Sequence, residues 1–385
     1  MKSVKDGHEA RCRLALCTIM FFIWPLSRGL KWGGAGPTQG AAMRLLKLTR
    51  IIHSASLVAA LIALAVAWPA AAQTSIKFSL DGRLEGLAAT FFLPQDRGFF
   101  KNEGLDVTVD EATTALEPIT RVASGAYEMA LADINTLIRY RDQHPSSPLK
   151  AVFMLYNKPP FAIVARRSRG ITEPKQLEGK KLGTPPVGVT FEWPLFAKLN
   201  NVDAAKVTIE TIGFPVRAPM LAAGQIDAAL GYSFRLYVDL KDRGVPVDDI
   251  VLMPMADYGL KLYGNTIIIN PKFAAEKPEA VRGFLRAFLQ GLKELVHRPA
   301  EAVDSIMRRD DTVKREVELE RLRMAIRDNI VTPEVKANGF GAVDFARLAE
   351  SIDQIGLVYT FKAKPKAEDI FDQSFLPPAA DRKVH

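Results

Sequence analysis

The chain has 385 residues, a net charge of +8 and two cysteines. Residues 1–72 hold nine Lys or Arg and two acids, so the rest of the chain has a net charge of about +1. This balance argues against a basic face for nucleic acid. The length is sufficient for two domains with cores of their own.

The N-terminal region has the pattern of a secretory signal peptide. Three basic residues between 44 and 50 precede a short apolar run over 55–68, and the Ala-rich Pro69–Ala72 stretch ends before Gln73. The run is shorter than the ~20 apolar residues that span a bilayer, and a buried core helix is the alternative. We expect residues 1–72 to be an N-terminal extension plus signal peptide, cleaved near Ala72/Gln73, with Met43 as the true start.

Both cysteines, Cys12 and Cys17, lie in the segment expected to be removed. The exported chain would then have no disulfide, thiolate metal site or cysteine nucleophile. Residue 73 is Gln rather than Cys, so no lipid anchor is expected there. A cysteine-free exported chain suits a bacterial periplasm, which we take as its location.

Strand-like and helix-like runs alternate through the first two-thirds of the exported part. The expected order is a strand over 76–80, a helix over 87–102, a strand over 105–109, a helix over 117–124, a strand over 127–132, a helix from 133 and a strand over 151–155. From residue 278 onward mainly helices are expected, over 281–295, 300–307, 315–328 and 344–355. This α/β order predicts parallel-rich sheets with helices on both faces.

Two segments, Ala123–Leu131 and Ala222–Leu230, look alike. Each contains a helix end, a glycine C-cap, one acidic residue and a short apolar strand, which suggests two lobes with the same local construction. The β-rich runs over 161–165 and 266–269 would each cross once between the lobes. We therefore expect a first lobe of residues 73–165 plus 266–385, a second lobe of 166–265, and a ligand cleft at the C-terminal ends of the strands.

Polar residues at strand ends of the first lobe are candidate ligand contacts. Asp81 follows the first strand and could accept a hydrogen bond from a ligand or cap its own turn. Asp133 and Asn135 follow the repeated strand. Asp133 suits a helix N-cap, as does Ser233 at the matching place in the second lobe.

The second lobe offers a turn and three tyrosines as candidate contacts. The turn follows a strand at 181–184 and opens a helix, whose free N–H groups favour an anion or a polar ring, while its glycine permits close approach of a ligand. An ordinary βα turn is the alternative. The tyrosines could stack on a ring or lie half-buried in a sheet. These candidates are Pro186, Val187, Gly188, Val189, Thr190, Tyr232, Tyr258 and Tyr263.

Positive indications of catalysis are missing from the sequence. It has no nucleophile elbow, no zinc-protease motif and no dinucleotide glycine pattern. The histidines after residue 72, His144, His297 and His385, lack metal-ligand spacing. We expect no catalytic residue, no metal and no cofactor.

Several segments resemble the nitrate/sulfonate/taurine and thiamine-pyrimidine binding proteins of ABC importers. The opening of that family is matched by Lys77–Asp81 and Phe92–Val107, and further matches are Leu177–Gly183, Gly224–Ala228 and Asn270–Phe284. The resemblance implies a type II periplasmic binding protein fold of two lobes with a two-crossing hinge. It also implies a monomer that carries a small organic solute to an ABC permease and ATPase. The ligand classes implied are sulfonate- or taurine-like, nitrate-like and pyrimidine- or thiamine-precursor-like.

One branch of the family is enzymatic, and it is the alternative function. That pyrimidine synthase consumes its own histidine and holds pyridoxal phosphate on a lysine. Ala88 and Ala132 stand at the corresponding places here, and the cysteine cluster of that branch, near 259–263, is absent. The sequence therefore disfavours the synthase.

The chain also departs from the binding-protein pattern after Asp81. Gly82 and Arg83 follow where a Trp is usual, which removes an aromatic wall for a pyrimidine. Arg83 would suit an anionic ligand such as a sulfonate or carboxylate through paired N–H donors, and a surface arginine is the alternative.

Overall fold

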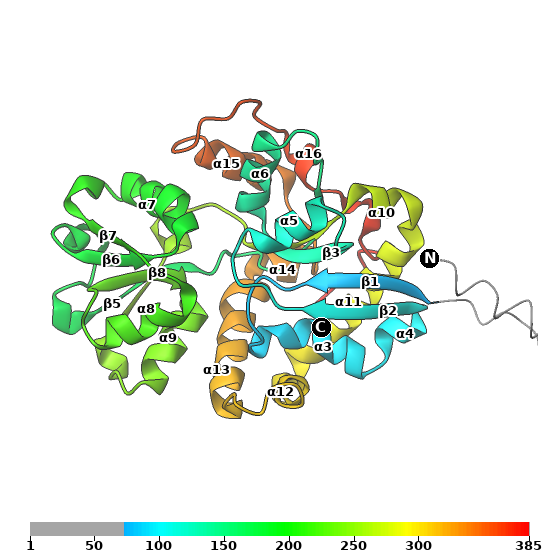
Figure 1. Ribbon diagram of the computed structural model, residues 1–385, viewed down its shortest axis with the longest axis horizontal. Coiled ribbons are helices and arrows are strands. Elements are labelled where there is room, and N and C mark those ends of the chain that lie inside the picture. The colour runs from blue at the N-terminus through cyan, green and yellow to red at the C-terminus, as the bar shows by residue number, and fades with distance from the viewer. Residues whose placement is uncertain (1–72, 385) are drawn as a thin grey trace, which may run out of the picture. The chain divides into compact units, whose positions relative to one another are not determined.

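Two five-stranded sheets form the frame of residues 73–384, the part of the chain that the computed structural model describes (Figure 1). These residues belong to one compact unit, 71–385. The sheet orders are β2-β1-β3-β10-β4 and β7-β6-β8-β5-β9. The strands are β1 (Thr74–Ser79), β2 (Leu105–Asp110), β3 (Met129–Asp133), β4 (Lys150–Met154), β5 (Phe161–Arg166), β6 (Lys181–Thr184), β7 (Thr208–Thr211), β8 (Ala228–Tyr232), β9 (Ile250–Pro254) and β10 (Asn265–Ile269).

Helices cover both sheets, and most lie where the sequence pattern predicts them. The α-helices are α3 (Ala89–Asp96), α4 (Phe99–Asn102), α5 (Glu117–Ala123), α6 (Ile134–Gln143), α7 (Trp193–Leu199), α8 (Phe214–Ala222), α9 (Ser233–Asp242), α10 (Pro271–Glu276), α11 (Pro278–His297), α12 (Pro299–Met307), α13 (Arg315–Ala325), α14 (Pro333–Asn338), α15 (Phe345–Ile355) and α16 (Ala367–Ile370). The helix expected over 87–102 is instead a 3₁₀ turn, η2 (Gly86–Ala88), followed by α3 and α4, and Gly98 with φ = 74° separates the last two. No helix among the described residues meets the length and hydropathy needed to cross a bilayer.

The two sheets have the same topology. In the first, β1 pairs in parallel with β2 and β3, and β10 is antiparallel to β3 and β4. In the second, β6 pairs in parallel with β7 and β8, and β5 is antiparallel to β8 and β9. The mixed α/β construction with two lobes, here defined by the two sheets and their helices, agrees with the sequence prediction.

The chain passes between the sheets after β4 and returns before β10 (Figure 1). The predicted lobe boundaries are wrong by several residues at these crossings. Strand β5 lies in the second sheet although residues 161–165 were expected in the first lobe, and Asn265 opens β10 of the first sheet although it was expected in the second lobe. An apolar run fixes burial on both faces of a strand but does not say which sheet it joins.

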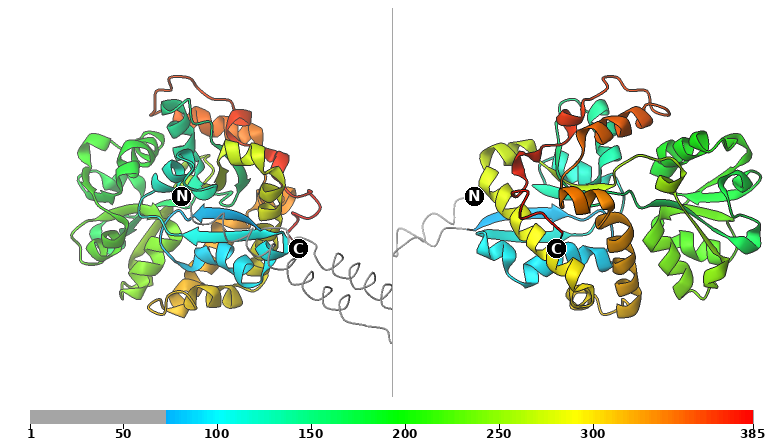
Figure 2. Two further views of the ribbon diagram at one scale, coloured as in Figure 1. Left: turned by 45° about the vertical axis from the view of Figure 1, so that its right-hand side comes forward. Right: turned by 180° about the vertical axis from the view of Figure 1, so that it is seen from behind.

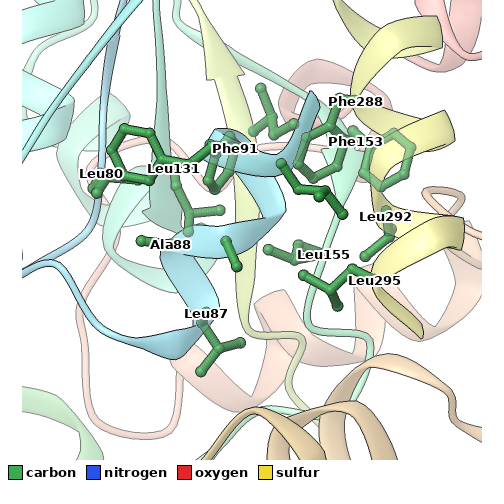
Figure 3. Packing of buried hydrophobic residues seen from close by; sticks show 14 of the residues in the cluster. Leu80, Leu87, Ala88, Phe91, Leu131, Phe153, Leu155, Phe288, Leu292 and Leu295 are labelled. Atoms are coloured by element: carbon green, nitrogen blue, oxygen red, sulfur yellow. The ribbon is translucent and has the colours of Figure 1, made fainter. Parts of the chain in front are cut away.

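The core of the first lobe is an aromatic stack between β1, α3 and α11 (Figure 3). Phe91 lies 4.4 Å from Phe78 and 5.0 Å from Phe288, measured between ring centroids. Gly291 of α11 lets Pro94 of α3 approach closely, since a Cβ there would collide with the proline ring. Each buried phenylalanine contributes ~1.5–3 kcal/mol through removal of apolar surface from water.

The second sheet is covered on both faces. Ile163 and Ala165 of β5 pack into the cluster that includes Phe191 and Phe196 on the α7 side, whereas Ala162 and Val164 pack into the cluster of α8 and α9. This alternation along one strand follows from the two-residue period of side chains in a β-strand. Helices α7 and α8 therefore lie on opposite faces of the second sheet.

Helix α13 lies between the two lobes (Figure 2, right). It packs on α9 of the second lobe and on η2 and α12 of the first. Arg321 of α13 forms a 2.6 Å ion pair with Asp239 of α9, and the same guanidinium contacts Glu318. Arg321 is buried, whereas the Asp239 side chain is 39% exposed, so this link between the lobes is only partly shielded from solvent.

The predicted repeat between the lobes is confirmed in detail. Gly125 and Gly224 adopt φ = 75° and 71°, the left-handed conformation of a helix C-cap. The acidic residue that follows plays the same part in each lobe. Glu128 accepts a hydrogen bond from the backbone N–H of Lys77 on β1, and Asp227 accepts one from that of Lys181 on β6.

Candidate ligand-binding cleft

A cleft opens where the carboxyl ends of the parallel strands of both sheets meet. Its outer cavity has a volume of about 620 Å³ and its inner cavity one of about 50 Å³. The two adjoin because five lining residues are common to both: Ala115, Thr136, Pro185, Val187 and Phe214. A site at this edge is typical of open α/β sheets, and the volume falls in the usual range for small organic ligands.

Half of the residues predicted from the sequence line this cleft. Asp81, Asp133 and Tyr232 line the inner cavity, and Pro186, Val187 and Thr190 line the outer one. The predicted residues that do not appear among the lining residues are Arg83, Asn135, Gly188, Val189, Tyr258 and Tyr263.

The corner between β3 and α6 supplies a carboxylate whose hydrogen bonds stay within its own lobe. Asp133 caps α6, as predicted, with Oδ1 accepting from the backbone N–H of Thr136 at 2.7 Å and from its hydroxyl at 2.9 Å. Its Oδ2 accepts from Asn135, whose amide also donates to the carbonyl of Tyr263. Asn135 thus holds Asp133 in place and is itself fully buried.

The matching corner between β8 and α9 is built differently. Ser233 was expected to cap α9 but is its first residue, and Tyr232 occupies the cap without a side-chain hydrogen bond. The hydroxyl of Tyr232 instead donates to Asn265 of the first sheet at 3.0 Å. The amide of Asn265 donates to Asp81 at 2.7 Å, which links the two lobes across the floor of the cleft.

Arg235 completes this floor. Its guanidinium lies 5.0 Å from the Tyr232 ring centroid, forms a 2.6 Å ion pair with Glu85 and approaches Asp81 at 4.0 Å. Burial acts to raise the pKa of Glu85, but attraction to Arg235 and Arg321 outweighs it and the pKa is lowered. At Asp81 burial prevails over Arg235, and the pKa is raised.

The arginine of the cleft floor is therefore Arg235, not Arg83. Arg83 is exposed and outside the cleft lining. Gly82 explains the departure from the family's tryptophan, because a Cβ at this position would lie 3.3 Å from Nη2 of Arg235. An aromatic side chain there would compete for the space of that guanidinium.

The turn after β6 leaves few backbone N–H groups free to donate to a ligand. Pro185 and Pro186 have no N–H, and the N–H groups of Gly188 and Val189 both donate to the carbonyl of Pro185. Gly188 is needed because a Cβ there would collide with the hydroxyl of Thr184, not because a ligand approaches. The expected anion site on these backbone groups is thus poorly supplied with donors.

The two later tyrosines pack away from the cleft. Tyr263 is fully buried, donates to Glu334 at 2.7 Å and lies 3.9 Å under the guanidinium of Arg347. Tyr258 packs edge-on against Phe196 at 5.9 Å. Their closeness to the crossing could be read from the sequence, but the direction of their side chains depends on tertiary packing.

Besides Arg235, two further ionisable residues of the inner cavity were not foreseen. Glu192 ends a π-helical turn, η5 (Gly188–Glu192), and its Oε2 is buried without a hydrogen-bond partner among residues 73–384. Burial raises the pKa of Glu192 to about 8, against the attraction of Arg139. Arg217 of α8 is 5% exposed, and its Nε likewise lacks a partner. Such π-helical turns are frequent at functional sites, which is the one local sign that could have pointed to Glu192.

The outer cavity has an aromatic and basic rim. Tyr140 and His144 stack at 4.2 Å between ring centroids, and Phe214 of the second lobe lines the same cavity. Arg139 also lines this cavity and lies 4.3 Å from the Phe191 ring centroid. Within residues 73–384 no group of three or more His, Cys, Asp or Glu side chains is placed to hold a metal ion.

The NMT1/THI5 like family model matches residues 88–302. The chain belongs to this family.

The formylaminopyrimidine-binding protein of Halalkalibacterium halodurans is 27% identical over 307 residues, which cover 77% of this chain and 89% of that protein. The riboflavin-binding protein RibY of Chloroflexus aurantiacus is 28% identical over 222 residues, 56% of this chain and 61% of that relative, so the match spans less than two-thirds of it. The pyrimidine phosphate synthase THI13 of Saccharomyces cerevisiae is 28% identical over 237 residues, 59% of this chain and 68% of the synthase.

Solved structures agree on the fold. The aliphatic sulphonate binding protein SsuA of Escherichia coli superposes with a TM-score of 0.62 at 11% identity, covering 78% of this chain and 92% of that one. The nitrate-binding protein NrtA of Synechocystis gives 0.51 at 11% identity, covering 65% and 70%. These likenesses confirm the expected two-lobe fold of periplasmic binding proteins.

Proposed function

We propose that this protein is an exported solute-binding receptor of an ABC importer. The observation that carries the proposal is the cleft of about 620 Å³, lined by residues of both lobes, among them α6 of the first lobe and the turns after β6 and β7 of the second. A ligand that contacts both lobes favours their closure, which is how a two-crossing hinge converts binding into a shape that a permease can recognise. The receptor is proposed to act as a monomer in the periplasm, without a cofactor and without nucleic acid as a partner.

The cleft favours an organic solute over a bare inorganic anion. Nitrate would fill a small part of the outer cavity, whereas Tyr140, His144 and Phe214 offer ring faces for a planar group. Ligands named for the relatives, a formylaminopyrimidine and riboflavin, are planar heterocycles. Sulfonates of the taurine type remain candidate ligands because arginines line the inner cavity.

The synthase of the same family is the competing function. The places expected for its histidine and lysine hold Ala88 and Ala132, which are buried side chains with no reactive group. Ala132 lies in β3 with 1% of its surface exposed. These two positions support binding over synthesis for this chain.

A ligand screen by thermal unfolding and calorimetry tests the receptor function. The panel is riboflavin, a formylaminopyrimidine, taurine, alkanesulfonates and nitrate. A ligand at 100 times its Kd adds ~2.7 kcal/mol to the free energy of unfolding. X-ray scattering with and without that ligand should then report a smaller radius of gyration. A protein that responds to no member of the panel, or converts one of them to product, contradicts the proposal.

A matched pair of substitutions locates the binding in the cleft. Ala115→Trp fills space that both cavities share and should abolish the thermal shift. Ala346→Trp places the same side chain on the exposed start of α15, outside the cleft, and should leave the shift unchanged. Equal effects of the two would place the binding elsewhere.

A further inference from the structure

Arg217 reaches the inner cavity as a buried cation. It lies on α8, and its Nη1 donates to the carbonyl of Leu230 in β8. Its guanidinium lies 4.8 Å from the Phe214 ring centroid. Gly231 leaves room for the Arg217 guanidinium, since a Cβ at residue 231 would lie 2.6 Å from Nη1 of Arg217. The local packing therefore holds this group at the cleft.

This cation forms no ion pair within residues 73–384, and the carboxylates that attract it, Asp239 and Glu85, are paired with Arg321 and Arg235 instead. No carboxylate there lies within ion-pair distance of Arg217, and Nε has no hydrogen-bond partner. Its neighbour Arg235 differs, because Glu85 and Asp81 compensate it. Burial, followed by repulsion from Arg235, lowers the pKa of Arg217 to about 10, so it stays charged at neutral pH. A buried charge without a partner is costly, and a ligand anion would relieve that cost.

Glu192 approaches the inner cavity from the other face of the second sheet and offers a hydrogen-bond acceptor, whereas Arg217 offers a cation. It precedes α7, whereas Arg217 lies on α8, and these helices cover opposite faces. The charges that act on Glu192 are Arg139 and Asp133, not Arg217, so the two groups do not neutralise each other. The Glu192 carboxyl is 2% exposed with an unpartnered Oε2 in the inner cavity, and an N–H donor of a ligand could satisfy it.

We propose that the second lobe selects its solute by two contacts, an anionic group on Arg217 and an N–H donor on Glu192. The solute class is then an organic anion that also bears an amine, amide or ring N–H group. This inference rests on the proposed receptor function and narrows it. Nitrate lacks the donor and a neutral heterocycle lacks the anion, so neither meets both contacts.

Small probes separate the two contacts. The protein is purified from cells that express the full chain, and unfolding is followed at pH 7 and constant ionic strength. Methanesulfonate and methylphosphonate test the anion contact against chloride. Taurine against ethanesulfonate, and 2-aminoethylphosphonate against ethylphosphonate, test the added N–H donor. The wild-type protein should melt ~2–4 °C higher with an anion probe, and higher still with its amino counterpart.

Variants assign each response to its residue. Arg217→Met should lose the anion response, and Arg217→Lys should keep a smaller one, because lysine retains the charge without the planar fork. Glu192→Met should keep the anion response and lose the additional gain from the amino group, because methionine removes the carboxyl acceptor. Arg323→Met removes an exposed arginine of α13 outside the cleft and should respond like the wild-type protein.

The outcomes separate this inference from the receptor function. A wild-type protein that responds to neither anion, or an Arg217→Met variant that keeps the full response, overturns the inference. If a neutral member of the solute panel binds and its affinity survives Arg217→Met, the receptor function stands and the inference fails. If no solute and no anion binds, both fail.

Discussion

The two corners that face the cleft have the same backbone arrangement, but their side chains make contacts of different kinds, within one lobe at the first corner and between the lobes at the second. Asp133 and Thr136 in the first lobe occupy the places that Tyr232 and Arg235 occupy in the second. The first pair bonds within its own helix start, whereas the second pair reaches across to Asn265 and Glu85 of the first lobe. The repeat therefore supplies the scaffold, and the side chains of the second corner supply the connection between the lobes.

Cutting that connection should produce the largest effect. Arg235→Met leaves Glu85 and Asp81 half-buried without their counter-charge, and we expect a loss of ~3–4 kcal/mol in the free energy of unfolding. Urea denaturation at pH 7 measures it. A double-mutant cycle with Glu85→Gln isolates the pair, and effects that add within ~0.5 kcal/mol would show that the two residues are not coupled.

Glu192, the buried carboxyl of the second corner's lobe, should make the stability of the protein depend on pH. Burial raises the pKa of Glu192 to about 8, so the folded protein keeps this proton up to about pH 8, whereas the unfolded chain releases it near the ordinary glutamate pKa of 4.5, and stability falls as pH rises between these values. Glu192→Gln removes that loss. Its stabilising effect should be ~2–3 kcal/mol larger at pH 8 than at pH 5.

Urea denaturation at the two pH values measures this difference. Glu316→Gln is the control, since the Glu316 side chain is 82% exposed and should give no such trend. A Glu192→Gln variant whose effect is the same at both pH values would mean that the carboxylate is already ionised and compensated in the folded protein.

Removing the cap of the first corner should cost less. Asp133→Ala takes the acceptor from the N–H and hydroxyl of Thr136 and from Asn135, for an expected loss of ~2 kcal/mol. Hydrogen exchange should show the first turn of α6 opening more often than that of α9. Equal protection of the two helix starts would contradict the difference drawn between the corners.

The glycines of the repeat should give the smallest and most similar effects. Gly125→Ala places a Cβ at φ = 75° with only Asn270 nearby, at 3.8 Å, and should cost ~1 kcal/mol. Gly224→Ala has φ = 71° and must also displace the guanidinium of Arg169, so its cost should be slightly higher. Thermal unfolding compares them, and a cost near zero at either site would break the equivalence of the two C-caps.

Local patterns were sufficient for most of the fold. Hydrophobic periodicity located the helices α11, α12 and α15 within a few residues, and the glycine-acid-strand repeat identified β3 and β8 as equivalents. The boundary at β5 was misplaced because a strand buried on both faces reads the same in either sheet. The predicted signal peptide falls on residues 1–72, outside the residues that the structure describes, and stays a prediction.

The sequence by itself determined the two-lobed frame, since secondary structure follows from near neighbours along the chain and the repeat is local. It also indicated the edge of the sheets where a ligand could enter, and it named Asp81, Asp133 and Tyr232 at that edge. Only the tertiary structure decided which charges meet there. Arg235 reaches Glu85 from 150 residues away, while Glu192 and Arg217 converge on one cavity from opposite faces of a sheet. Such meetings depend on side-chain direction and on burial, and no spacing along the chain encodes either.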